Sequence, residues 1–287
     1  MSTECIVLDF DGTFTEVDAE ARPFVEVFRR AIAEIVGPQI AARWDATRER
    51  VLADPDGHGW ENEGRIVAPA HADPYVLSTS IAQILVAECG TIAPAERAAT
   101  VERVFGSSYP HAAVAFRPDA RMVVEALVKS GLPVFVVTNS RTEHVKAKLE
   151  KLAPAGLEHV VVRGDARKFV VTAPELPLVS PWTERWSAIP ESRVVAGLGR
   201  PVYLQRGAYF DAIRRISEET GVEPEAMLVC GDIWELDLAL PALLGARIHL
   251  VTRPGTPDHE KRAVRATRGG STSANLAGLL AELEITG

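Results

Sequence analysis

The sequence predicts an α/β protein in which a doubly wound, Rossmann-like parallel sheet carries an inserted α-helical domain. Two observations lead to this class. Short apolar runs without polar alternation recur along the chain, as in parallel strands that helices cover on both faces. Segments with helical periodicity separate these runs, and strands that alternate with helices are typical of a doubly wound sheet.

Four apolar runs are the predicted strands of this sheet: Cys5–Leu8, Val134–Val137, Met227–Cys230 and Arg247–Val251. The first three lead into polar residues, namely Asp9, Thr138 and, after one glycine, Asp232. Ligands of such sheets bind at the carboxyl ends of the strands. We therefore expect these three residues to meet at one edge of the sheet, although they are far apart in the sequence.

Four segments near these strands have helical spacing: Pro118–Lys129, Glu143–Leu152, Ala208–Thr220 and Leu236–Leu244. Residues 138–140 are expected to open the second of these helices, and Ser271–Ile285 to form a closing helix.

Residues 16–115 have a different pattern and contain no convincing strand. Their helical candidates are Ala21–Val36, Gln39–Leu52, Pro74–Glu88 and Pro94–Phe105, with a long loop from Ala53 to Asp73. A stretch of this length is large enough to form a small domain. We expect residues 1–15 and 116–287 to form the α/β domain and residues 16–115 to form a separate helical domain.

A second insertion spans about residues 164–202. Two short apolar runs, Val160–Val162 and Phe169–Val171, lie at its start, and it contains Trp182 and Trp186. It is compatible with a β-rich flap or with an oligomer contact, as in a homodimer.

The chain is acidic, with a formal net charge of −8. Nucleic-acid binders usually present a basic face, so nucleic acid is not an expected partner. No apolar stretch reaches the roughly 18 residues that a membrane span needs, so a membrane is not expected either.

The N-terminus lacks a signal-peptide pattern and the three cysteines are scattered, so a cytoplasmic protein with reduced thiols is expected.

The strongest motif is Asp9-Phe10-Asp11-Gly12-Thr13, at the end of the first predicted strand. Two carboxylates so close together repel each other, and a divalent cation would relieve the repulsion. The alternative is a solvated Asp-Gly turn with no chemical role.

This motif resembles the first motif of the haloacid dehalogenase (HAD) superfamily of aspartate-nucleophile phosphotransferases. Val136–Asn139 resembles the second motif, an apolar strand that ends in Thr or Ser. Val229–Asp237 resembles the fourth, a strand that ends in Gly-Asp with another acid a few residues later. The resemblance covers roughly residues 1–15 and 116–251, without the insertions. The helical domain after the first motif would then be a cap.

The resemblance implies a Mg²⁺-dependent phosphatase that acts on a small phosphorylated metabolite. Asp9 would be the nucleophile that forms an aspartyl-phosphate, and Asp11 the general acid and base. Mg²⁺ would be held by Asp9, the backbone carbonyl of Asp11 and Asp232. Thr138 and Asn139 would bind the phosphoryl oxygens.

The third family motif is a basic residue, usually Lys, that neutralises the nucleophile and the phosphate. Arg206, just before the helix that leads to the fourth motif, is the favoured candidate, and Lys168 is its rival. Arginine can bind phosphate bidentately, so it is chemically suitable. Either residue could instead be a surface charge. Glu235 or Asp237 could support the metal, or could be acids that stabilise a helix N-terminus.

Other activities and roles are alternatives to this one. A 2-haloacid dehalogenase needs no acid at Asp11, and a phosphonate hydrolase would need a cap lysine, which residues 16–115 lack. A phosphomutase keeps both aspartates and stays open. Outside catalysis, a phospho-signalling receiver module would have about half this length, and a non-catalytic scaffold would not need Asp9, Asp11, Thr138 and Asp232 together.

Overall fold

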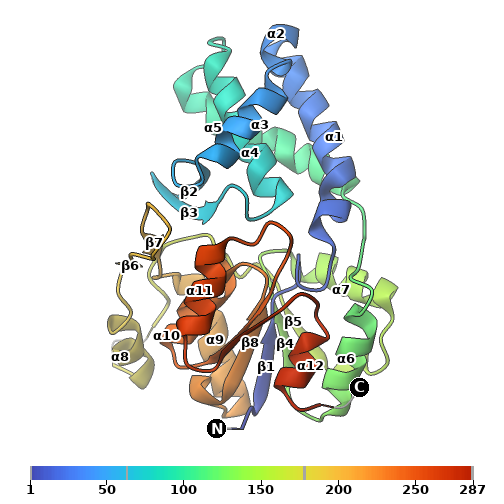
Figure 1. The fold of residues 1–287 in the computed structure, drawn as a ribbon, viewed down its shortest axis with the longest axis vertical. Helices are drawn as coiled ribbons and strands as arrows, with labels where there is room; N and C mark the ends of the chain where they lie inside the picture. The colour runs from blue at the N-terminus through green and yellow to red at the C-terminus, as the bar shows by residue number, and fades with distance from the viewer. Residues whose placement is uncertain (1, 63, 177–178, 286–287) are drawn as a thin grey trace. The chain divides into compact units, whose positions relative to one another are not determined.

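A computed structural model describes residues 2–62, 64–176 and 179–285. The chain divides into two compact units, one of Met1–Thr15 with Phe116–Gly287 and the other of Glu16–Ala115. Figure 1 shows the elements of both.

The first unit contains a six-stranded parallel sheet with the order β10-β9-β8-β1-β4-β5. Its strands are β1 (Cys5–Leu8), β4 (Val134–Val137), β5 (Val160–Arg163), β8 (Met227–Gly231), β9 (Arg247–Val251) and β10 (Gly270–Ser273). All four predicted strands are confirmed. Leu8 is in register with Val136 of β4 and Cys230 of β8, so the polar residues that follow these three strands lie at one edge.

Helices cover both faces of the sheet (Figure 1). Val7 points into the core that is closed by α9 (Gly207–Thr220), α10 (Ala239–Leu243) and α11 (Asp258–Ala266). Its neighbours Ile6 and Leu8 point into the opposite core, which is closed by α6 (Ala120–Lys129), α7 (Thr142–Leu152) and α12 (Gly278–Glu282). The predicted α/β class is therefore confirmed.

Two predictions for the C-terminal half are wrong in detail. Leu236–Leu244 is not one helix, because a π-helical turn over Trp234–Leu238 precedes α10. The tail first forms strand β10, and only then the short helix α12. The polar sequence of β10, Gly-Ser-Thr-Ser, has no apolar run, and its strand conformation depends on parallel pairing with β9.

The second insertion is not a β-rich flap. It contains α8 (Pro181–Ser187) and a short antiparallel pair, β6 (Ser192–Arg193) with β7 (Val202–Tyr203). Trp182 and Trp186 pack edge-on against Phe210 of α9, with ring centroids 5.6 and 5.1 Å apart. The apolar run Phe169–Val171 forms no strand.

The unit Glu16–Ala115 consists mainly of helices, as expected: α1 (Val17–Val36), α2 (Pro38–Ala41), α3 (Trp44–Ala53), α4 (Pro74–Glu88) and α5 (Pro94–Ser108). Phe24, Phe28 and Ile81 are among the side chains of its separate apolar core. The expectation that it has no strand is wrong, because β2 (Gly59–Asn62) and β3 (Arg65–Pro69) form a hairpin. Among the described residues of both units, no helix is long and apolar enough to cross a membrane.

Candidate active site

The turn after β1 is fixed by its own residues. Gly12 has φ +85°, and a Cβ atom there would lie 2.2 Å from Oδ2 of Asp232, so only glycine fits. The Gly12 N–H donates to Oγ1 of Thr15 at 3.0 Å, and the Arg117 guanidinium donates to the Gly12 carbonyl at 2.8 and 3.1 Å. Thr13 donates its hydroxyl to Asp9 at 3.2 Å. The turn therefore presents Asp9 from a rigid support.

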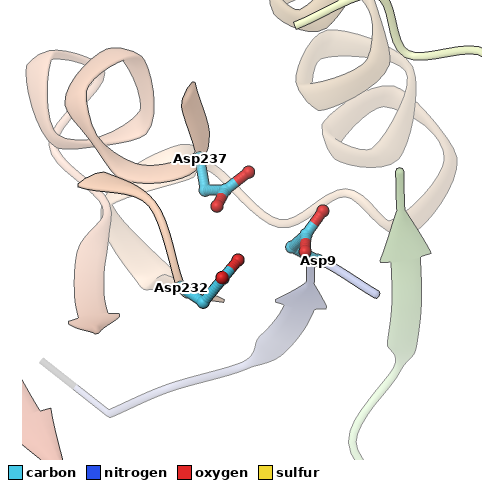
Figure 2. A group of neighbouring side chains, drawn as sticks. All are labelled: Asp9, Asp232 and Asp237. Carbon is cyan, nitrogen blue, oxygen red and sulfur yellow. The ribbon is translucent and has the colours of Figure 1, made fainter. Parts of the chain in front are cut away.

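Three buried aspartates form the centre of the site (Figure 2). Asp9 follows β1, Asp232 follows β8, and Asp237 lies in the π-helical turn. One carboxylate oxygen from each lies within 4.8 Å of the other two. Burial, and next the charge of Asp237, raise the pKa of Asp9 well above its ordinary value, although Lys168 acts against them. The cluster thus concentrates negative charge that a cation would stabilise.

Lys168 supplies one such cation. Its Nζ lies 2.8 Å from Oδ1 of Asp9 and 2.9 Å from Oδ1 of Asp237, with only 1% of the side chain exposed. It also lies 5.1 Å from the centre of the Tyr209 ring. Burial alone would lower the pKa of Lys168, but the charges of Asp237 and Asp9 more than offset this and raise it. The side chain is therefore an ammonium group against the expected nucleophile.

Arg206, the basic residue that the sequence favoured, does not reach Asp9. Its Nε donates to the Tyr203 carbonyl at 3.0 Å and its Nη1 donates to the carbonyl of Lys168. Its Nη2 lies 3.7 Å from Glu235. The structure thus brings Lys168, and not Arg206, to the aspartate cluster.

Asp11 lies beside the cluster and is held by groups from the next strand and helix. Its Oδ2 accepts from the hydroxyls of Ser140 at 2.6 Å and Thr138 at 3.4 Å. Its Oδ1 accepts from Nζ of Lys148, on α7, at 3.0 Å. Sequence reasoning missed Ser140 and Lys148. The position of Ser140 two residues after Thr138 was an available signal, whereas Lys148 reaches Asp11 only because α7 packs beside the turn.

Thr138 and Asn139 follow β4, as expected, but they do not open α7, which begins at Thr142. The buried Thr138 hydroxyl accepts from the Ser140 N–H at 3.1 Å. The Asn139 side-chain carbonyl accepts from the backbone N–H of Lys168 at 2.7 Å. Asn139 thus connects the second motif to the loop that carries Lys168.

The two acids of the π-helical turn, Glu235 and Asp237, have different partners. Asp237 belongs to the aspartate cluster, whereas the buried Glu235 forms a bidentate ion pair with Arg200 at 2.9 and 2.7 Å. Asp232 pairs with Arg253, whose Nε lies 2.8 Å from its Oδ2. Arg253 follows β9 and was also missed by sequence reasoning.

The donor chemistry of the cluster fits a magnesium ion. Mg²⁺ prefers carboxylate and carbonyl oxygens, and Asp9, Asp232 and Asp237 offer three carboxylates at the same edge of the sheet. Burial first, and then the charges of Asp237 and Asp232, raise the pKa of Asp9, and a divalent cation would offset those charges.

Comparisons with known proteins show the family of the chain. A model of the haloacid dehalogenase-like hydrolase family matches residues 3–245. None of the curated proteins matches the chain. A protein assigned as a phosphoglycolate phosphatase from Haemophilus somnus has a similar structure, with a TM-score of 0.55 at 14% identity over 98% of each chain.

Two further solved structures are similar over nearly the whole chain. The HAD-hydrolase YfnB from Bacillus subtilis, bound to magnesium, gives a TM-score of 0.51 at 12% identity over 99% of this chain and 100% of that one. A protein described as a β-phosphoglucomutase from Thermotoga maritima gives 0.52 at 12% identity over 98% and 99%. At these identities the likeness shows the shared fold.

Proposed function

The chain belongs to the haloacid dehalogenase-like hydrolases, and from this premise we propose that it is a Mg²⁺-dependent phosphatase of small phosphorylated metabolites. The observation that carries the proposal is the arrangement around Asp9. Lys168 contacts its carboxylate, and Asp232 and Asp237 lie beside it. The Asp11 carboxylate, in the same turn after β1, accepts a hydrogen bond from Thr138 at the end of β4. A nucleophile, a neutralising cation and a second carboxyl group thus share one edge of the sheet.

The proposed reaction has two steps. Asp9 attacks the phosphorus in line, and a bond from its carboxylate oxygen to phosphorus forms as the ester P–O bond breaks. Asp11 gives a proton to the departing oxygen. In the second step Asp11 takes a proton from water, the water oxygen attacks phosphorus, and the bond to Asp9 breaks. Inorganic phosphate leaves, and both aspartates return to their first state.

The other polar groups have supporting roles in this proposal. Lys168 neutralises negative charge between Asp9 and the phosphoryl group. Thr138 offers its hydroxyl to a phosphoryl oxygen. Asn139 contributes through its contact with the Lys168 backbone.

Asp9, Asp232 and the carbonyl of Asp11 would hold Mg²⁺, with Asp237 close enough to bind it or a water ligand. The bound ion supplies Lewis-acid stabilisation of the phosphoryl charge. The relative YfnB is bound to magnesium, which supports the same ion here.

The alternative within the family is a dehalogenase, and Asp11 argues against it. A halide leaves without a proton, so a dehalogenase would not need a carboxyl group held by Ser140 and Lys148 at this place. A phosphomutase would use the same residues and remains the second candidate, because one fold relative is described as such an enzyme.

Product analysis tests the proposal. We expect Mg²⁺-dependent release of inorganic phosphate from p-nitrophenyl phosphate and no halide release from 2-chloropropionate. Chelation by EDTA should stop the reaction and added Mg²⁺ should restore it. Halide release without phosphate release would contradict the proposal. Transfer of phosphate between positions of a sugar phosphate, without release, would favour the phosphomutase.

A further inference from the structure

The loop that carries Lys168 adopts an unfavourable backbone conformation. Asp165 and Arg167, on either side of Ala166, have φ values of 53° and 47°, in the left-handed region that non-glycine residues rarely adopt. The Ala166 N–H donates to the Thr138 carbonyl at 2.9 Å, and the Lys168 N–H donates to Asn139 at 2.7 Å. These bonds hold the loop from the side of β4.

Arg206 holds the same loop from the opposite side. Its guanidinium spans two backbone carbonyls, those of Lys168 and Tyr203, and only 1% of its side chain is exposed. Burial lowers the pKa of Arg206 to about 10, so the group stays charged at neutral pH. A charged donor forms a stronger hydrogen bond with a carbonyl than a neutral donor does.

The start of α9 is in close contact with the chain that follows Lys168. The Gly207 N–H donates to the Thr172 carbonyl at 2.8 Å, and a Cβ atom at Gly207 would lie 2.4 Å from that oxygen. The backbone next to Arg206 is therefore held against the chain that follows Lys168.

Glu235 is a buried counter-ion of Arg206. It lies 3.7 Å from Arg206 and forms two closer bonds with Arg200, at the end of the second insertion. Glu235 belongs to the same π-helical turn as Asp237. These buried ions thus support both members of the Lys168–Asp237 ion pair. Arg206 bonds to the backbone of Lys168, and the turn that contains Glu235 also carries Asp237.

We propose that Arg206, anchored by Glu235 and Arg200, is a positioning residue that holds the Lys168 ammonium between Asp9 and Asp237. Its catalytic consequence rests on the proposed phosphatase function, but the placement of Lys168 does not. The second insertion thereby acquires a role, since it delivers Arg200 to the anchor.

Chemical labelling of Lys168 tests this placement without reference to activity. Reductive methylation with formaldehyde and borohydride, followed by peptide mass spectrometry, reports access to each lysine. We expect Lys168 to react at least about tenfold faster in Arg206→Met than in the wild type, as expected for the loss of a charge-assisted bond. Lys148 serves as the internal reference. Arg214→Met is the matched control on the same helix, because Arg214 pairs with Asp211 and Glu218 and does not contact the loop.

The kinetic readout uses p-nitrophenyl phosphate. We expect kcat to fall about tenfold or more in Arg206→Met, with a smaller change in KM and with a thermal unfolding midpoint close to that of Arg214→Met. Glu235 keeps its bidentate partner Arg200 in this variant, so no buried carboxylate loses every cation. If Arg206→Met does not fold, Arg206→Lys takes its place in the labelling and kinetic measurements. It keeps the charge near Glu235 but cannot donate to both the Lys168 and Tyr203 carbonyls.

Protection of Lys168 in the folded variant equal to that in Arg214→Met would overturn the proposal. Full restoration of both readouts by Arg206→Lys would also overturn it, because charge alone would then suffice. If Lys168 becomes accessible but the wild-type protein hydrolyses no phosphate ester, the positioning role stands and the phosphatase assignment fails.

Discussion

Asp9 is the residue at which the physical forces of this site conflict most. Burial favours its neutral form, and Asp237 and Asp232 oppose its charge, while Lys168 favours the carboxylate. The proposed nucleophile must be the carboxylate, and in the proposed reaction the ammonium of Lys168 and a divalent cation would together favour that form.

Gly12 allows a test of the cluster at a residue that carries no charge. An alanine there would require φ +85° and would place its Cβ 2.2 Å from Oδ2 of Asp232. We predict that Gly12→Ala weakens Mg²⁺ binding at least about tenfold, because Asp232 must move, and lowers stability by roughly 1–2 kcal/mol from backbone strain. Isothermal titration with Mg²⁺ and urea unfolding measure the two effects.

Gly131 provides the matched control for this substitution. It has φ +76°, and a Cβ atom there would meet nothing within 4 Å. Gly131→Ala should therefore reproduce the strain and leave Mg²⁺ binding unchanged. Equal Mg²⁺ affinity in both variants would contradict the claim that Asp232 binds the ion.

The choice between Lys168 and Arg206 shows what sequence spacing could not decide. Both residues were candidates, and Arg206 was favoured because the family resemblance places the third motif at the start of the helix before the fourth motif. The side chain of Arg206 instead turns to the carbonyls of Tyr203 and Lys168. The loop from which Lys168 reaches Asp9 has two residues with positive φ, a conformation that the sequence does not indicate.

At the scale of elements, strands with apolar runs were predictable and strands that depend on pairing were not. β1, β4 and β8 are identified by continuous apolar residues, and β9 by an apolar run that His249 interrupts. β10 (Gly-Ser-Thr-Ser) and β2 (Gly-Trp-Glu-Asn) have no apolar run, and β3 (Arg-Ile-Val-Ala-Pro) is a brief one inside the predicted loop, so their pairing was not evident from the sequence. The π-helical turn over Trp234–Leu238, which carries the buried Glu235 and Asp237, was likewise not predicted.

His249 couples β9 to β10 and makes this edge of the sheet sensitive to acid. Its ring nitrogens lie 2.8 Å from the hydroxyls of Ser271 and Ser273. Burial lowers the pKa of His249 to about 4. Because the unfolded chain takes up this proton near pH 6.5, the stability that depends on neutral His249 is present above that pH and is lost as the pH falls toward about 4.

We predict a loss of about 2 kcal/mol of unfolding free energy from His249 between about pH 7.5 and about pH 5. Urea unfolding at both pH values measures it. His249→Gln keeps polar atoms near both serines without a titrating ring, and its stability should fall by about 2 kcal/mol less over the same interval. An identical pH dependence in the two proteins would show that His249 binds its proton as readily in the folded protein as in the unfolded chain, and would contradict the lowered pKa.

At the scale of the whole molecule, residues from distant parts of the chain form one charged site. The sequence order of the motifs, together with the rule that parallel strands end at one edge, was enough to predict that Asp9, Thr138 and Asp232 would meet. The contacts of Lys148, Arg253 and Arg200 could not be predicted, because they depend on how helices and loops pack around that edge.

Mg²⁺ should stabilise the whole folded protein, because only the folded chain assembles the carboxylate cluster. An ion at about one hundred times its dissociation constant adds about 2.7 kcal/mol, which corresponds to a rise of several degrees in the unfolding midpoint. Differential scanning calorimetry with and without Mg²⁺ measures the shift. Asp232→Asn should lose it, and Asp258→Asn, an exposed control that pairs with Lys261, should keep it. A shift of equal size in both variants would place the ion elsewhere.

The covalent step on Asp9 is the central claim, and intact-protein mass spectrometry tests it most directly. Asp11→Asn removes the base that activates water, so p-nitrophenyl phosphate and Mg²⁺ should leave one phosphoryl group on the protein, mapped to Asp9 by peptide sequencing. Asp9→Asn in the same background should carry none. A phosphoryl group on another residue, or hydrolysis of the ester by a protein that carries Asp9→Asn, would contradict the account.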